Sequence, residues 1–98
     1  MTKYTLYLGT TYNPDNQRSL IQDVEKELYD PEGMFSVLEG YTFHSAAGFY
    51  KGKFEKCFVL TYTGNNRSAI DKICEQYKKK FAQESVLVDV QLLEAFFV

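Results

Sequence analysis

The sequence has no tryptophan, one histidine, two cysteines and two prolines among its 98 residues. A single histidine excludes a metal site built from several histidines, and it argues against a Cys/His catalytic pair, because neither cysteine lies in a recognised motif. Cys57 and Cys74 are too far apart in sequence for a metal or redox motif, so we expect reduced, buried thiols. The sequence therefore predicts no metal site and no cofactor.

Long apolar runs and an excess of positive charge are also missing. No stretch approaches the length of a membrane span, and the first ten residues lack the apolar segment of a signal peptide. The net charge of −2 gives no general attraction to nucleic acid or acidic membranes, and Lys78-Lys79-Lys80 is expected on a solvated helix face. We expect a cytoplasmic protein, of a bacterium or of a host cell infected by a virus that encodes it, with no nucleic-acid or membrane partner.

Aromatic residues are abundant, with eight Tyr and eight Phe. A small core can bury the phenylalanines, but each buried tyrosine hydroxyl needs a hydrogen-bond partner. Some tyrosines are therefore expected to line an interface or the rim of a pocket.

The periodicity of apolar residues predicts a single domain over residues 1–98. Glycine within the first strand, at Gly9, indicates a bulge or the close approach of another group. Asn13 is expected to cap a first helix whose first residue is Pro14, or the regular helix begins later, near Arg18. The second helix is expected to be capped by Asn65 or Asn66. The predicted strands are Tyr4–Thr11, Met34–Ser45, Phe54–Thr63 and Ser85–Leu93, and the helices run to about Leu28 and Phe81.

This order predicts an α+β, ferredoxin-like β-α-β-β-α-β sandwich, with an antiparallel sheet and both helices on one face. The first and third strands are expected at the centre. The other face would carry apolar and aromatic residues, which predicts a homo-oligomer built face to face or through strand edges. The last residues, Ala95 to Val98, are expected to be buried against the sheet or a neighbour.

Candidate ligand-binding residues gather around the connection predicted at Ala46–Lys53. Tyr50, Lys51 and Lys53, between pivots at Gly48 and Gly52, can form a lid that grips an anionic or aromatic ligand, or simply a solvated loop. His44 is either an acid–base group or a strand histidine with an ordinary hydrogen bond.

Further candidates lie outside the predicted loop. Glu55 is either a cross-strand partner for a lysine or a buried acid. Gln83 and Glu84 can satisfy backbone groups where the second helix ends, or can bind a ligand amide or ribose. Arg67, in the first turn of that helix, opposes the helix dipole, which indicates another use such as binding a phosphate or carboxylate.

The segment Tyr77-Lys-Lys-Lys-Phe81-Ala-Gln83-Glu84-Ser85-Val86-Leu87 resembles the YxxxFxQESVL ending of a bacterial family known as domain of unknown function 3574. A Gly48-Phe-Tyr50 step followed by Glu55 also resembles the glycine-plus-aromatic segment before the strand-three glutamate of that family. The resemblance implies no activity or catalytic residue. By pattern alone, the chain is also similar to PII-like signalling proteins, ferredoxin-like trimers that bind nucleotides or other small anions between subunits.

These observations favour a non-enzymatic, oligomeric protein that binds or sequesters a small anionic or nucleotide-like ligand between subunits, near the loop joining the second and third strands. Two alternatives remain. One is a small cofactor-free enzyme of the dimeric ferredoxin-like barrel type that uses His44 and a tyrosine. The other is a structural subunit that binds protein through its open sheet face.

Overall fold

A computed structural model describes residues 1–10, 20–50 and 52–98, except for the side chain of Tyr50. No helix within these ranges is long and apolar enough to cross a membrane. Along the chain the elements are β1 (Thr2–Gly9), α1 (Ile21–Tyr29), a 3-10 helix η1 (Met34–Val37), β2 (Thr42–Tyr50), β3 (Lys53–Gly64), α2 (Arg67–Lys80) and β4 (Leu87–Leu92).

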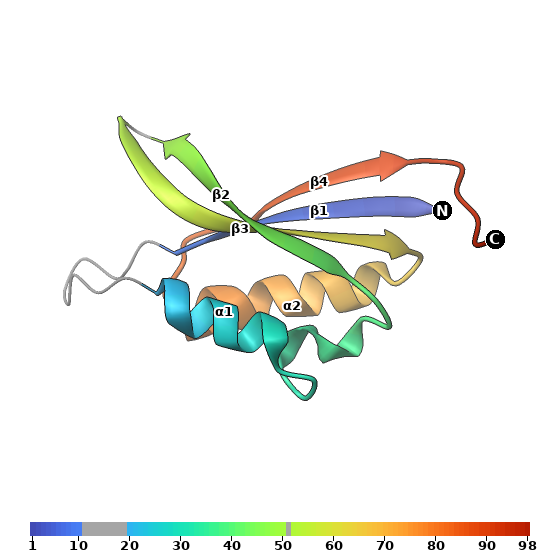
Figure 1. Cartoon of the computed structure of the whole chain (residues 1–98), viewed down its shortest axis with the longest axis horizontal. Helices are drawn as coiled ribbons and strands as arrows, with labels where there is room; N and C mark the ends of the chain where they lie inside the picture. The colour runs from blue at the N-terminus through green and yellow to red at the C-terminus, as the bar shows by residue number, and fades with distance from the viewer. Residues whose placement is uncertain (11–19, 51) are drawn as a thin grey trace.

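The strands form one antiparallel sheet in the order β2-β3-β1-β4, and both helices cover the same face of it (Figure 1). The α+β, ferredoxin-like fold is therefore confirmed, with β1 and β3 at the centre. Because β1 pairs with β3 only as far as Gly9 and Cys57, the β2–β3 hairpin continues beyond β1 and curves away from the helices.

The core lies between the sheet and the helices. Alternation in β1 places Tyr4, Leu6 and Leu8 on the covered face, where all three are buried. Both helices bury residues at helical spacing. The buried helix residues are Val24 and Leu28 of α1 and Ala69, Ile70, Ile73 and Tyr77 of α2. At the start of α2, the Asn66 side chain accepts a hydrogen bond from the Ala69 N–H at 3.1 Å, as one of the two predicted caps.

The second strand begins later than predicted. Residues Met34–Val37, expected to open it, form the 3-10 helix η1, and Phe35 from this turn is completely buried in the core. The Tyr41 hydroxyl donates to the Leu28 carbonyl at 2.7 Å and fixes the chain before β2 begins. The residues around Phe35 have the composition of a strand, but packing of the Phe35 ring against the helices makes this segment a helical turn.

The connection predicted at Ala46–Lys53 is also mostly strand. Ala46 pairs with Cys57 and Gly48 with Glu55, so β2 continues to Tyr50. Gly52, at φ +80°, makes the turn into β3, which needs the left-handed conformation that glycine adopts readily. Gly48 is not a pivot. Lys51, and the predicted helix start at Asn13, Pro14 or Arg18, lie outside the described residues.

The uncovered face of the sheet, here called the bare face, is more polar than expected. Thr5, Thr61 and Thr42 form one row across three of its four strands, because Thr61 pairs with both of the others. Exposed apolar residues lie on β4 and after it, where Leu92, Phe96 and Phe97 are 83%, 80% and 93% exposed. They also lie near the tip of the β2–β3 hairpin, where Phe49 and Phe54 pair with each other and are 64% and 80% exposed. The expectation that this chain itself buries its last residues is wrong.

Replacing Phe35 tests the role of η1. Phe35→Ala should lower the free energy of unfolding by about 3–5 kcal/mol, because it removes a fully buried aromatic ring from the core. Val37→Ala, at an exposed position of the same turn, should cost less than about 0.5 kcal/mol. Urea unfolding of both variants measures the difference, and equal losses would contradict this placement of the turn.

Candidate functional site

Residues from separate segments of the chain converge where β1 ends. Gly9 is the last residue of β1, and its pairing with Cys57 places it on the bare face. Glu55, two residues before Cys57 on β3, shares that face and is half-buried. Gln83 reaches the same place from the connection between α2 and β4. We call Gly9, Glu55, Tyr77 and Gln83 the Gly9 cluster.

The missing side chain of Gly9 is what allows this convergence. A Cβ atom at Gly9 would lie 3.0 Å from Gln83 Oε1 and 3.3 Å from Glu55 Oε1. The carboxylate and the amide therefore occupy the space that any larger residue would need. This confirms the expectation that Gly9 marks the close approach of another group.

The end of α2 holds Gln83 in place. Ala82 adopts the left-handed conformation at φ 52°, and the Gln83 N–H donates to the Lys78 carbonyl at 3.0 Å, which closes the helix in a Schellman motif. The side-chain Nε2 of Gln83 donates to the Phe81 carbonyl at 3.0 Å. Because its amide nitrogen is engaged by the helix end, Gln83 presents its oxygen to Gly9.

Tyr77 ties the same helix to β1. Its ring is buried and packs against Phe81, with ring centroids 4.8 Å apart, and its hydroxyl donates to the Gly9 carbonyl at 2.5 Å. Burial raises the pKa of Tyr77, and the negative charge of Glu55 raises it further. Tyr77 therefore stays protonated near neutral pH and positions Gly9 instead of acting as a base.

Neighbouring groups on the bare face are also held in their neutral forms. Burial raises the pKa of the Cys57 thiol, and Glu55 adds to this, so the group is a poor thiolate nucleophile. The Tyr7 hydroxyl donates to Asp89 Oδ2 at 3.2 Å, and that hydrogen bond raises the pKa of Tyr7. Around Tyr7 and Cys57, the bare face thus offers carboxylates and neutral hydrogen-bonding groups.

The candidates expected from sequence are spread over three places. Glu55 belongs to the Gly9 cluster, and exposed Glu84 directly follows Gln83. His44 is exposed on the bare face, where it pairs with Val59, and Lys53 is exposed at the start of β3. The side chains of Tyr50 and Lys51 lie outside the described part of the structure.

Arg67 lies far from the Gly9 cluster. It begins α2, whose 14 residues put it about 20 Å from the end that carries Gln83, at 1.5 Å per residue. Its Nε atom lies 3.3 Å from Asp71 Oδ1, and both side chains are well exposed. This i, i+4 ion pair accounts for an arginine in the first turn without a ligand.

Sequence reasoning did not single out Gly9 or Tyr77 as parts of a site. One signal was nevertheless available, because the YxxxFxQESVL pattern contains Tyr77, Phe81 and Gln83, and the strand-three glutamate is Glu55. Of the residues in these patterns, Glu55, Tyr77, Phe81 and Gln83 lie together around Gly9.

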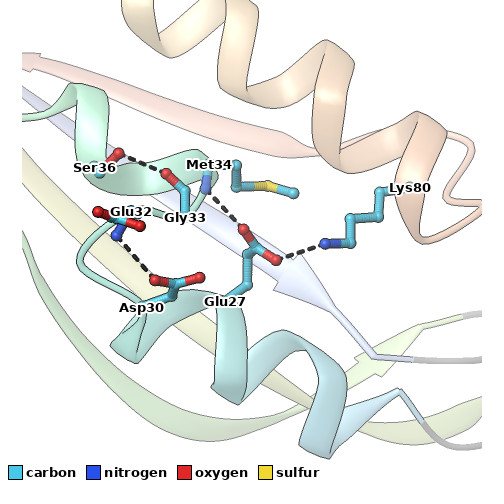
Figure 2. Close-up of polar contacts among 7 residues, drawn as sticks. All are labelled: Glu27, Asp30, Glu32, Gly33, Met34, Ser36 and Lys80. Atoms are coloured by element: carbon cyan, nitrogen blue, oxygen red, sulfur yellow. Dashed lines mark hydrogen bonds and ion pairs between the residues drawn. The ribbon is translucent and has the colours of Figure 1, made fainter.

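A second polar region lies on the helix side of the molecule. It borders an open hollow of about 620 Å³ between the end of α1 and the end of α2. Glu27 joins the segments around it: Oε1 accepts from the Met34 N–H at 2.7 Å and Oε2 from Lys80 Nζ at 2.6 Å (Figure 2). These contacts cross-link α1, η1 and α2, so we assign Glu27 a structural role.

Within residues 1–10, 20–50 and 52–98, no three or more His, Cys, Asp or Glu side chains lie close enough together to hold a metal ion.

Comparison with known proteins identifies structural neighbours only. No protein-family model matches the sequence, and no curated protein matches it. A phage SAM lyase in complex with S-methyl-5′-thioadenosine superposes with a TM-score of 0.63 and 15% identity, covering 92% of this chain and 79% of that chain. A phage SAM lyase in the apo state gives 0.62 and 20%, covering 92% and 78%. At these identities the likeness shows a shared fold.

Ala82→Gly tests how the end of α2 is held. Glycine adopts the left-handed conformation without the steric cost that alanine bears, so the variant should be more stable by about 0.5–1 kcal/mol. Ala95→Gly, at an exposed position without a positive φ, should be neutral or slightly destabilising. Thermal unfolding compares the two, and a loss of stability in Ala82→Gly would contradict the assignment.

Glu27→Gln tests the helix-side cross-link. The Lys80 ammonium lowers the pKa of Glu27 from 4.5, so its carboxylate contributes stability that is fully present above 4.5 and lost as pH falls through the lower folded value. The variant should be less stable than the wild type by about 1 kcal/mol at neutral pH. The difference should shrink below pH 4.5, whereas exposed Glu25→Gln should show little effect. A constant difference across pH would contradict this account.

Proposed function

We propose that this protein binds a small adenosine-containing ligand of the S-adenosylmethionine and S-methyl-5′-thioadenosine class at the Gly9 cluster. The observation that carries the proposal is the convergence of the Glu55 carboxylate and the Gln83 amide over the bare backbone of Gly9. The shared fold with phage proteins that act on or hold such compounds supports this choice of ligand class.

The chemistry of the cluster suits a nucleoside. Ribose presents two adjacent hydroxyl donors, and a carboxylate accepts up to about four hydrogen bonds, so Glu55 can accept one from a ribose in addition to its contacts within the chain. Gly9 allows a ligand to approach the backbone closely. Tyr7, which is partly exposed, offers an aromatic face near the same end of β1.

The charge of the site favours a neutral or cationic ligand over an anion. Glu55 and Asp89 both lie on the bare face, and their negative charges would attract a sulfonium or ammonium group. The anionic ligand expected from the lysines near the hairpin fits this end of the sheet less well. Under the proposal, His44 and Lys53, on the same face, line the approach to the cluster.

Catalysis is the second candidate function, and the lyase activity named for the structural neighbours favours it. In such a reaction the bond between the sulfonium sulfur and the amino-acid portion of S-adenosylmethionine breaks as the substrate's own carboxylate forms a C–O bond to the same carbon, which closes a lactone. The electron pair of that bond goes to sulfur, and S-methyl-5′-thioadenosine is released. Glu55 would then bind and orient the cationic substrate. A phage origin and a cytoplasmic site of action would fit either function.

Glu55→Gln tests the proposed site. Isothermal titration calorimetry with S-adenosylmethionine and with S-methyl-5′-thioadenosine should show binding to the wild type. The variant should bind at least one of them about 10- to 100-fold more weakly, because it loses a charged hydrogen-bond acceptor. Gly9→Ala should weaken binding at least as much, since its Cβ would displace both Glu55 and Gln83.

Glu84→Gln is the matched control, because it makes the same chemical change at an exposed position. It should bind as the wild type does. Chromatography of the S-adenosylmethionine mixture separates the two functions: an unchanged ligand indicates a binding protein, and accumulating S-methyl-5′-thioadenosine indicates a lyase. Absence of binding to either compound, or equal weakening by both glutamine variants, would refute the proposed site.

A further inference from the structure

The outer edge of β4 has the properties of a pairing surface. Among the described residues, no strand pairs with this edge, since β4 is the last strand of the sheet. Its sequence is LVDVQL, and Leu87, Val90 and Leu92 are 62%, 49% and 83% exposed. Edge strands of monomeric proteins usually carry charged side chains, above all lysine, or a proline or bulge that blocks association, and β4 has one charged residue, Asp89, and no lysine or proline.

The hydrogen bonds at the end of β4 show which backbone groups face outward. The Leu93 N–H donates to the Met1 carbonyl at 3.0 Å, and the Met1 ammonium donates to the Leu93 carbonyl at 3.2 Å. Both backbone groups of Leu93 therefore point toward β1. Because backbone groups alternate in direction along an antiparallel strand, those of Val88, Val90 and Leu92 point outward.

We propose that two copies of this chain pair antiparallel through β4 about a two-fold axis at Val90, forming one continuous eight-stranded sheet, from 4 strands per copy. Val90 of one copy pairs with Val90 of its partner, and Val88 pairs with the partner's Leu92. Each such pair exchanges two backbone hydrogen bonds, so the three symmetric pairs supply about six. The inference rests on the strand edge and does not depend on the proposed ligand.

Charge selects this register over its neighbours. Moving the axis to Asp89 would place two carboxylates directly opposite each other, which is destabilising. A shift of the pairing by one residue would place polar side chains of one copy beside apolar side chains of the other on each face of the sheet. With the axis at Val90, Asp89 lies opposite the partner's Gln91, whose amide can donate to it, while valine and leucine meet on the other face.

The same register has a consequence for the exposed residues after β4. The segment that follows Leu92 in one copy runs past Leu87 of its partner, toward the connection that carries Gln83. Phe96 and Phe97, almost fully exposed in one chain, would then have a surface to cover. A second copy would thereby approach the Gly9 cluster from the side of β4.

Val90→Pro tests the pairing without breaking the sheet of one copy. Proline removes the outward N–H of Val90, which makes no bond to β1, and edge strands tolerate such a proline. In analytical ultracentrifugation without ligand, the wild type should form a dimer within the micromolar range, and Val90→Pro should be a monomer. Val90→Thr, which keeps the N–H and the branched shape, should still form the dimer.

Two further variants test the register. Gln91→Lys should tighten the dimer and Gln91→Asp should weaken it, each by about 2- to 30-fold, because two Asp89–Gln91 pairs change in every dimer. Val90→Cys should form a disulfide-linked dimer on oxidation, since paired Cα atoms lie about 5.5 Å apart. Val37→Cys, a valine with the same 49% exposure elsewhere, should not.

A wild type that stays monomeric throughout the micromolar range would overturn the inference. So would a dimer that forms equally well with Val90→Pro and gives no crosslink with Val90→Cys, because another surface would then be used. If Val90→Pro fails to fold, the crosslinking pair and the opposite effects of the two Gln91 variants decide the matter. None of these measurements involves a nucleoside, so they stand or fall separately from the proposed ligand site.

Discussion

The hydrogen bond from Tyr77 to the Gly9 carbonyl is the contact on which the end of the sheet depends. It joins residues 68 positions apart and links the last turns of α2 to the last residue of β1. Without its acceptor, the buried Tyr77 hydroxyl would be unsatisfied, at a cost of about 1–3 kcal/mol. The bond thus determines where α2 lies along β1, and the left-handed Ala82 then turns Gln83 toward Gly9.

Local patterns predicted most of the fold because they are strong where the core is. Apolar residues in β1 alternate with the period of a strand, and those in α2 recur with the period of a helix, over several residues in each case. Asn66 is a typical helix cap. Periodicity gives the wrong secondary structure where the same residues are compatible with both a strand and a helical turn. Residues Met34–Val37 suit a strand by composition, and only the burial of Phe35 against the helices makes them a 3-10 turn. Conversely, Ala46 and Gly48 have weak strand propensity, yet their partners on β3 hold them in β2.

The candidate site was less predictable because its residues are brought together by the pairing register of β1 and β3. Glu55 could be recognised as a candidate acid, and Gly9 as a point of close approach, but each observation is local. They meet because Gly9 pairs with Cys57, which places Glu55 two residues further along the same face. A shift of one residue in that pairing would direct Glu55 to the opposite face. Arg67 shows the reverse case, since its partner Asp71 was one helical turn away in the sequence.

The positions of the exposed apolar residues favour self-association along a strand edge over face-to-face packing of two sheets. A bare face rich in aromatics would call for face-to-face packing, which would cover the Gly9 cluster. The threonine row removes that demand, and β4 and the residues after it carry exposed leucine, valine and phenylalanine side chains, as does the β2–β3 hairpin with Phe49 and Phe54. Association along an edge extends a sheet without covering its faces, because strands pair in the plane of the sheet. The two proposals are therefore compatible in space: the edge of β4 can pair while the bare face stays open to a ligand.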